Sequence, residues 1–222
     1  MNPHLTRNLT KLAIAIAAVL TPAATHADTF NFHVDLNLAG IVGTPTSPFF
    51  LDFQLNEGSG TLQNSVTISN FLFTGGSPTG SPSIFSDTAT GDLGSSISII
   101  DNPSSAFNEI FQGFTAGTTD IQFDVTLSQN VSGVTPDGFL IQLLDSQAGN
   151  PVIPTTDPNG TMLTVPIGSA NTLADVATFT SISPAGATAT ASAVPEPSAA
   201  VALVGGAACL LGLRRRRAQI AA

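Results

Sequence analysis

Strict alternation of apolar and polar residues is the dominant pattern in the first two thirds of the chain. At residues 30–38 the even positions are Phe, Val or Leu, while the odd positions are Asn, His or Asp. The same period of two recurs at residues 49–55, 121–127 and 139–143. Because successive side chains of a strand point to opposite faces, these segments predict strands with one buried face.

Several other segments carry a shifted or weaker pattern. The apolar phase slips by one residue at Ser69-Asn70, which predicts a β-bulge or a strand that changes sheets. Leu140 and Leu144 add apolar side chains to the second face of the strand at 139–143, so this strand is predicted to be covered on both sides. Shorter strands are expected at residues 97–100, 163–165 and 177–182, and a short helix at residues 106–111.

Turn-forming residues separate these segments. Gly, Pro, Asp and Asn cluster at residues 57–60, 75–80, 136–138 and 157–160. Many short strands with little helix predict an all-β fold, an antiparallel β-sandwich of roughly eight to ten strands, with a jelly roll as a compatible variant. We expect one domain over residues 28–183, because about 150 residues suffice for a single core.

Both ends of the chain differ from this body. Arg7 and Lys11 precede an apolar run at residues 12–20, and small residues precede a predicted signal-peptidase cut between Ala27 and Asp28. Residues 1–27 are therefore a predicted signal peptide. Residues 184–193 contain only Pro, Gly, Ala, Thr and Ser, a composition that predicts a flexible linker.

The C-terminal region has three parts. A proline-rich stretch that the ring geometry keeps extended precedes an uncharged apolar run at residues 199–213, and an arginine cluster follows it. As a helix the apolar run spans roughly 22 Å, less than the ~30 Å hydrocarbon core, so it predicts a short transmembrane helix with a cytoplasmic basic end. The flanking residues are Val194, Pro195, Glu196 and Pro197 before the run and Arg214, Arg215, Arg216 and Arg217 after it.

This region resembles the PEP-CTERM sorting signal of Gram-negative bacteria that secrete polysaccharide. The resemblance covers the export signal and residues 194–217, and it leaves residues 218–222 as a cytoplasmic tail. It implies Sec export, a transient stay in the inner membrane, cleavage by an exosortase near Pro195-Glu196-Pro197, and final association with the cell surface or extracellular matrix. Signal peptidase, the exosortase, and exopolysaccharide or surface proteins are the expected partners. The resemblance implies no activity.

The charge of the body follows from where the basic residues lie. All six Lys and Arg residues fall in the terminal signals, so residues 28–213 carry fifteen acidic side chains and no Lys or Arg, a formal charge of −15. Such a chain repels nucleic acid and anionic membranes and attracts divalent cations, neutral glycans or basic protein surfaces. Acidity also serves solubility. Cys209 lies in the apolar run, so no disulfide is expected in the body.

Candidate catalytic groups are few. His33 is the one histidine of the body, and Asp35 lies on the same face of its strand, but a nucleophilic triad needs further partners. Glu57 and Glu109 are candidates for a glycosidase carboxylate pair. Zinc sites need clustered His or Cys ligands, which the body lacks. We therefore predict that the protein is not an enzyme.

Calcium is the cofactor that the acidic loops suggest. Asp87, Asp92 and Asp157 lie in turn sequences whose oxygens suit Ca²⁺, although an Asx turn explains the same residues. The absence of Trp and Tyr removes the usual aromatic platforms for sugar rings, and most of the fourteen Phe lie at inward strand positions. The sequence thus predicts a structural or adhesive protein of a biofilm matrix. A calcium-assisted carbohydrate-binding module is the alternative, and a carboxylate-based glycosidase is a third reading.

Overall fold

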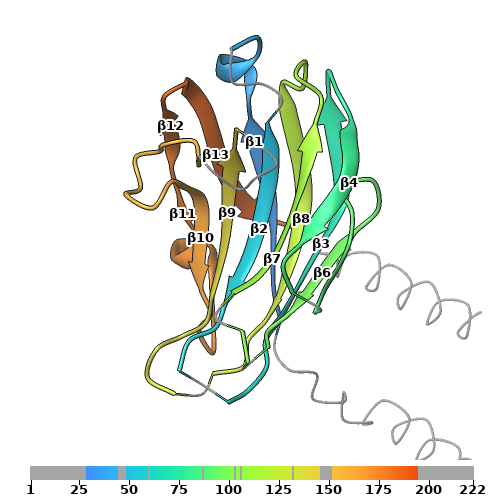
Figure 1. The fold of residues 1–222 in the computed structure, drawn as a ribbon. Helices are drawn as coiled ribbons and strands as arrows, with labels where there is room; N and C mark the ends of the chain where they lie inside the picture. Colours follow the sequence, from blue (N-terminus) through green and yellow to red (C-terminus); the bar gives the residue numbers. More distant parts are fainter. Residues whose placement is uncertain are drawn as a thin grey trace, which may run out of the picture.

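Two antiparallel β-sheets that pack face to face form the body of the protein (Figure 1). This computed structural model describes residues 29–44, 49–59, 61–86, 88–102, 104–105, 107–131, 133–145 and 152–194. The predicted signal peptide, and the sorting region beyond Val194 with its short transmembrane helix, lie outside the described residues. Within those residues, no helix is both long and apolar enough to cross a bilayer.

In the described part of the chain, the first sheet has seven strands and the second has six. The first, sheet A, has the order β12-β13-β1-β8-β3-β6-β5 and consists of β12 (Thr180–Ile182), β13 (Ala185–Ala193), β1 (Thr29–Asn37), β8 (Asp120–Ser128), β3 (Ser65–Thr74), β6 (Ile97–Ile100) and β5 (Ala89–Gly91). The second, sheet B, has the order β11-β10-β9-β2-β7-β4 and consists of β11 (Ala177–Thr178), β10 (Thr161–Pro166), β9 (Gly138–Leu144), β2 (Phe50–Asn56), β7 (Phe107–Phe114) and β4 (Pro78–Ile84). Two short 3-10 helices are η1 (Ala39–Ile41) and η2 (Leu173–Asp175).

The core lies between the two sheets and is built by the alternating segments. The four clearest segments form β1, β2, β8 and β9, as predicted, and their apolar faces meet in the core. Phe53 of sheet B contacts Phe123 of sheet A with ring centroids 5.5 Å apart, and it stacks on Phe139 at 6.5 Å. Offset and edge-on ring contacts of this kind add to the free energy of area burial, so the centre of the body is rigid.

The predicted phase slip in β3 is confirmed. Pairing between β3 and β8 shifts register between Ser69 and Leu72, and Asn70 has a φ of 58°. Asn is among the few residues that accept this left-handed conformation at low cost. The bulge lets one strand present Val66 and Ile68 to the core and continue along β8 afterwards.

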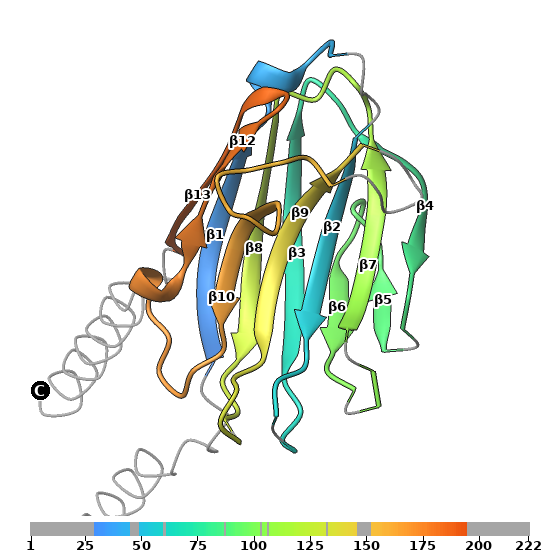
Figure 2. The ribbon, with the colours of Figure 1, turned by 60° about the vertical axis from the view of Figure 1, so that its left-hand side comes forward.

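Nested antiparallel pairing relates the strands. β1 pairs with β8, β2 with β7 and β3 with β6, while successive strands from β1 to β5 alternate between the two sheets. Figure 2 shows the result in sheet B, where β2 lies between β9 and β7 and β4 forms the edge. The nesting therefore places residues of β2 next to residues about 55 positions later in the sequence.

Residues 184–193 are not a flexible linker, so that prediction is wrong. β13 pairs with β1 from Phe32↔Ala193 to Asn37↔Thr188, and the side chains of Ala187 and Ala189 are buried. Alanine is large enough to fill the space beside β1, and the alternating Thr and Ser residues face outward. The folded unit therefore continues past the predicted boundary at residue 183 to Ala193.

The predicted helix at residues 106–111 is also wrong. Residues 107–111 belong to β7, whose inward face carries Asn108 and Gln112 beside Ile110 and Phe114, and residue 106 lies outside the described residues. Polar residues on the buried face hide the period of two, which explains the error. The predicted strand at residues 177–182 divides between sheets as β11 and β12, and the turn predicted at residues 75–80 includes the start of β4.

Candidate functional site

The outer face of sheet B, turned away from the core, carries a pair of carboxyl groups. Pairing of β2 with β7 sets Asp52 opposite Phe111 and Gln54 opposite Glu109. Asp52 and Glu109 are diagonal neighbours on this face, and their carboxyl groups lie close enough for each to influence the pKa of the other. Asp52 is fully buried despite its outward position, and Glu109 is half-buried. A strand face that looked solvent-exposed in the sequence thus holds an enclosed acidic group.

Amide side chains complete the polar part of this face. Gln54 Nε2 donates to Asp52 Oδ2 at 2.7 Å and to Gln142 Oε1 at 3.3 Å. Gln142 Nε2 in turn donates to the backbone oxygen of Asn159 at 2.9 Å, which ties the segment before β10 to the sheet. These bonds fix the side chains of three adjacent strand positions, so the polar groups are preorganised.

Burial is the main influence on both acids. It raises the pKa of Asp52 well above its usual range, and the neighbouring charge of Glu109 raises it further. Burial also raises the pKa of Glu109, against the opposing effect of the hydrogen bond from Asp52. Asp52 Oδ1 receives no hydrogen bond from an amide or hydroxyl donor. The pair therefore favours a state in which one carboxyl is protonated.

Three phenylalanine rings lie beside the carboxyl pair on the same face. Phe111 is buried, meets Phe50 edge-on at 6.3 Å and stacks on Phe85 at 5.5 Å with an interplanar angle of 22°. Phe85 is 64% exposed, and its backbone nitrogen donates to the backbone oxygen of Glu109 at 3.0 Å. An exposed ring supported by a buried ring next to a carboxyl group forms a fixed amphipathic surface. We call Phe85, Phe111, Phe50, Glu109, Asp52, Gln54 and Gln142 the outer-face site.

Glu57 does not join Glu109. Glu57 follows β2 and acts instead on a second acidic cluster between the ends of β6 and β9. There, burial raises the pKa of Asp101 to about 6, with smaller contributions from the charges of Asp137 and Glu57. Asp137 accepts hydrogen bonds from the Gly58 backbone nitrogen at 2.7 Å and from Asn64 Nδ2 at 2.6 Å. Glu109 therefore interacts with Asp52, whereas Glu57 acts on Asp101.

The outer face of sheet A holds the histidine. His33 Nδ1 lies 2.7 Å from Asp124 Oδ1, and Asn70 Nδ2 donates to Asp124 Oδ2 at 2.8 Å. Asp35 is a diagonal neighbour of Asp120 on this face, and it adds to the effect of burial in raising the pKa of Asp120. His33, Asp124 and Asn70 thus form a hydrogen-bonded network that joins β1, β8 and β3.

The calcium candidates make turns. Asp92 Oδ1 accepts from the Gly94 backbone nitrogen at 2.8 Å and from Ser95 Oγ at 3.0 Å. Asp157 Oδ2 accepts from the backbone nitrogens of Asn159 and Thr161 and from the Thr161 hydroxyl. Asp87 lies outside the described residues. Among the residues described, no three His, Cys, Asp or Glu side chains are grouped so as to hold a metal ion, and calcium binding stays a prediction.

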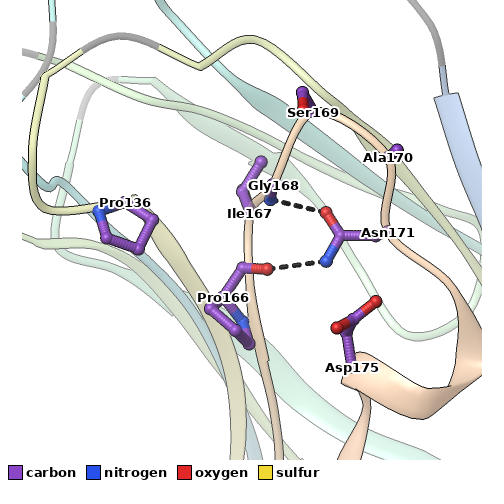
Figure 3. A pocket seen from close by; sticks show the side chains of 8 residues that line it. All are labelled: Pro136, Pro166, Ile167, Gly168, Ser169, Ala170, Asn171 and Asp175. Atoms are coloured by element: carbon purple, nitrogen blue, oxygen red, sulfur yellow. Dashed lines mark hydrogen bonds between the residues drawn. The ribbon is translucent and has the colours of Figure 1, made fainter.

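A hollow of about 320 Å³ lies at the end of the sheets (Figure 3). Asn171 crosses it, accepting from the Gly168 backbone nitrogen at 2.6 Å and donating to the Pro166 oxygen at 2.8 Å. Asp175 accepts from the backbone and hydroxyl of Thr172 at the start of η2. Asn171 and Asp175, which line the hollow, thus make hydrogen bonds to nearby groups of residues 166–172. The hollow is therefore a weaker candidate than the outer-face site.

The sorting residues remain predictions, because Val194 directly follows β13 and Pro195, Glu196, Pro197 and the arginine cluster lie outside the described residues. The predicted signal-peptidase site at Ala27 and Asp28 lies outside them as well. No protein-family model, curated protein or solved structure matches the chain.

Sequence reasoning named Glu109 as a candidate catalytic group but did not identify Asp52 or Phe85 as residues of the outer-face site. Asp52 was expected on a wet strand face, yet it interrupts an apolar run, Phe49-Phe50-Leu51-Asp52-Phe53, and an acid so placed is a signal of burial. Phe85 follows a segment rich in Gly, Pro and Ser, and nothing in that pattern distinguishes an exposed ring from a core ring.

Proposed function

We propose that this chain is an exported cell-surface or matrix protein with a structural or adhesive role, and that its outer-face site binds neutral polysaccharide. The observation that carries the proposal is the exposed ring of Phe85, stacked on Phe111 and adjacent to Glu109. The resemblance of the C-terminal region to a sorting signal supports the location. A location at the cell surface or in the matrix fits a protein that adheres to polysaccharide rather than one that catalyses a reaction.

The chemistry of the outer-face site suits a sugar ring. The apolar face of a pyranose packs on an aromatic ring, and its hydroxyl groups donate to carboxylate and amide oxygens at the rim. Phe85 offers the ring, while the half-buried side chains of Glu109 and Gln54 offer the acceptors. The formal charge of −15 over residues 28–213 disfavours acidic glycans, so the ligand is a neutral one.

The topology supports a jelly-roll-like β-sandwich as the scaffold. The nested pairs β1–β8, β2–β7 and β3–β6 are the order expected when a folded ribbon of antiparallel strands wraps into two sheets. Such a scaffold offers one complete outer face of each sheet as a surface. The site occupies the centre and one edge of that surface in sheet B.

Binding without hydrolysis follows from the spacing of the carboxyl groups. Retaining glycosidases hold their two carboxyl groups ~5–5.5 Å apart and inverting ones ~6.5–9.5 Å apart, to leave room for the sugar or a water. Asp52 is fully buried, and Glu109 is its diagonal neighbour on β7. This arrangement leaves no space for a glycosidic bond between the two groups.

Substitution of Phe85 tests the proposal. We expect Phe85→Ala to weaken binding to a neutral polysaccharide about tenfold, because loss of a ring contact of ~1–1.5 kcal/mol corresponds to roughly that factor. Affinity electrophoresis of the full chain in gels containing a neutral glucan, galactan or mannan measures the change. Leu72→Ala is the matched control, since Leu72 is a similarly exposed apolar side chain (58%) on sheet A. Equal retardation of the wild-type chain and Phe85→Ala on every retarding glycan contradicts the proposal, as does the absence of retardation.

A further inference from the structure

Three pairs of neighbouring carboxyl groups interact within the described part of the chain. One pair lies on the outer face of sheet B, one between the ends of β6 and β9, and one on the outer face of sheet A. The pairs are Asp52–Glu109, Asp101–Asp137 and Asp35–Asp120.

Such contacts need a neutralising partner. Two neighbouring ionised carboxylates repel each other, most strongly where they are shielded from water, and a nearby Lys or Arg favours their charged forms. Residues 28–213 have neither, and His33 is bonded to Asp124. Within this stretch of sequence, the charge of the pairs cannot be offset by a lysine or arginine.

The geometry at Asp52 identifies the partner. Its Oδ2 accepts from Gln54, whereas its Oδ1 is buried and has no amide or hydroxyl donor. A buried acceptor without a donor is costly, so Asp52 is the carboxyl that carries the proton, and Glu109 is the acceptor beside its O–H. Glu109 is the one ionisable group that acts on Asp52, while β9 and the segment before β10 present Gln142 and the Asn159 carbonyl.

The second pair shows where its proton lies. Asp137 accepts two short hydrogen bonds, from the Gly58 backbone nitrogen and from Asn64 Nδ2. Asp101 is 2% exposed, the contact from Asn108 Nδ2 is long at 3.4 Å, and burial raises the pKa of Asp101 more than the backbone hydrogen bond from Asn102 lowers it. The proton therefore resides on Asp101. Glu57 is the other charged group acting on this pair, and it adds to the repulsion that the proton relieves.

The third pair is more open. Asp120 accepts from Gln122 Nε2 at 3.0 Å and is influenced by Asp35 and, in the opposite sense, by His33. Asp124 beside it is bound by His33 and Asn70. Since Asp35 and Asp120 are only partly buried, solvent weakens their coupling.

We infer that each of the two buried pairs, Asp52–Glu109 and Asp101–Asp137, acts as a clasp, meaning two carboxyl groups held together by one proton. Each clasp stabilises the folded state at acid pH, and this stabilisation is lost as the pH rises. The first clasp joins β2 to β7 within sheet B. The second joins the end of β6 in sheet A to the start of β9 in sheet B, so it links the two sheets. The inference is independent of polysaccharide binding.

The sign of the effect follows from linkage. The folded state holds the proton of a raised-pKa carboxyl more tightly than the unfolded chain does, so this stabilisation is complete below the unfolded pKa. For Asp101 it declines as pH rises from the ordinary value of 3.8 to about 6, and above that value it is lost. Most proteins show the reverse trend over this range because their carboxylates are paired with cations.

Infrared spectroscopy and thermal unfolding of the full chain in mild detergent test the inference. We expect the carbonyl band of a protonated carboxyl to persist near pH 6 in the wild type, and the unfolding temperature to fall by about 5 °C or more between about pH 4 and pH 8. Asp52→Asn supplies an amide donor to Glu109 and is expected to remove part of the band. Asp101→Asn is expected to flatten the decline.

The control is Asp92→Asn, which removes one charge but retains the oxygen that accepts from Gly94. It should keep both the band and the decline. The infrared measurement on the wild type needs no variant to fold. A spectrum with only ionised carboxylates near pH 5, an unfolding temperature that rises with pH, or a profile that changes on adding a chelator would each overturn the inference, the last because a metal ion would then hold the pairs.

Discussion

Asn64, just before β3, is the most connected polar residue of the loops at one end of the sheets. Its Oδ1 accepts from Ser128 Oγ and the Asn130 backbone nitrogen, both at 2.9 Å. Its Nδ2 donates to the Asn130 oxygen at 2.8 Å and to Asp137 at 2.6 Å. The side chain is 1% exposed and uses its full hydrogen-bonding capacity, so it joins β3, β8 and the approach to β9.

We expect Asn64→Ala to lower the free energy of unfolding by roughly 3–4 kcal/mol, from about 1 kcal/mol for each of four lost hydrogen bonds. Chemical denaturation measures the loss. Asn31→Ala, at an exposed position on β1, is the control and should change stability by less than about 0.5 kcal/mol. A loss at Asn64 no larger than at Asn31 would show that this network does not contribute to stability.

Individual residues were predicted unevenly. Inward Phe, Leu and Val positions follow from the period of two, because burial of a strand face depends on local sequence alone. The partner of Glu109 could not be predicted, since it depends on which strand lies beside β7. Asp52 reaches it only through the nested pairing of strands more than fifty residues apart.

Among the elements, β13 shows how small residues form a strand that composition does not suggest. Ala187 and Ala189 turn inward beside β1, and Gly186 lies against Gly40, where an added Cβ would come within 2.9 Å of the Gly40 Cα. Gly186 also has a φ of 109°, which favours glycine. Close approach of η1 to β13 thus requires the small residues that made this segment resemble a linker.

Ala187→Asp distinguishes a strand from a linker. We expect it to destabilise the protein by at least about 3 kcal/mol, because it places an unpaired charge at a fully buried position in a body without Lys or Arg. Ser192→Asp on the exposed face of the same strand should have little effect. Thermal unfolding gives the comparison, and two equally stable variants would mean that β13 does not pack in solution.

Strands with regular alternation and large apolar residues were predicted well, and strands with polar inward residues or small ones were not. β7 buries Asn108 and Gln112, whose side chains bond to Leu55 and Leu93 backbone atoms. These partners come from β2 and from the turn between β5 and β6, so the hydrogen bonds of Asn108 and Gln112 cannot be predicted from the sequence of β7 alone. Tertiary hydrogen bonding therefore overrides the local pattern in this element.

At the scale of the molecule, the proposed export and the fold meet at Val194. β13 ends one residue earlier, so the predicted processing motif directly follows a paired strand. We expect replacement of Pro195, Glu196 and Pro197 by Ala to leave a longer, membrane-held species in a host that has an exosortase. Immunoblotting of membrane and released fractions measures it, with Ser192→Ala as control. Normal release of the triple variant would contradict exosortase processing.

The class of fold was predictable because it depends on the number and spacing of strands, but its topology was not. Periodicity shows that a segment is a strand and which side is buried. It does not show that β1 pairs with β8 and β13 rather than with β2, because those choices are made by long-range packing.

The antiparallel ladder between β1 and β13 also has a mechanical consequence. The chain leaves sheet A at the end of β13, and the ladder extends from that end, at Phe32↔Ala193, back to Asn37↔Thr188. A pull on the C-terminal end along the strand direction slides β13 against β1 and loads these hydrogen bonds together. A body retained through that end would therefore resist tension in shear, with its backbone bonds sharing the force, instead of opening one bond at a time.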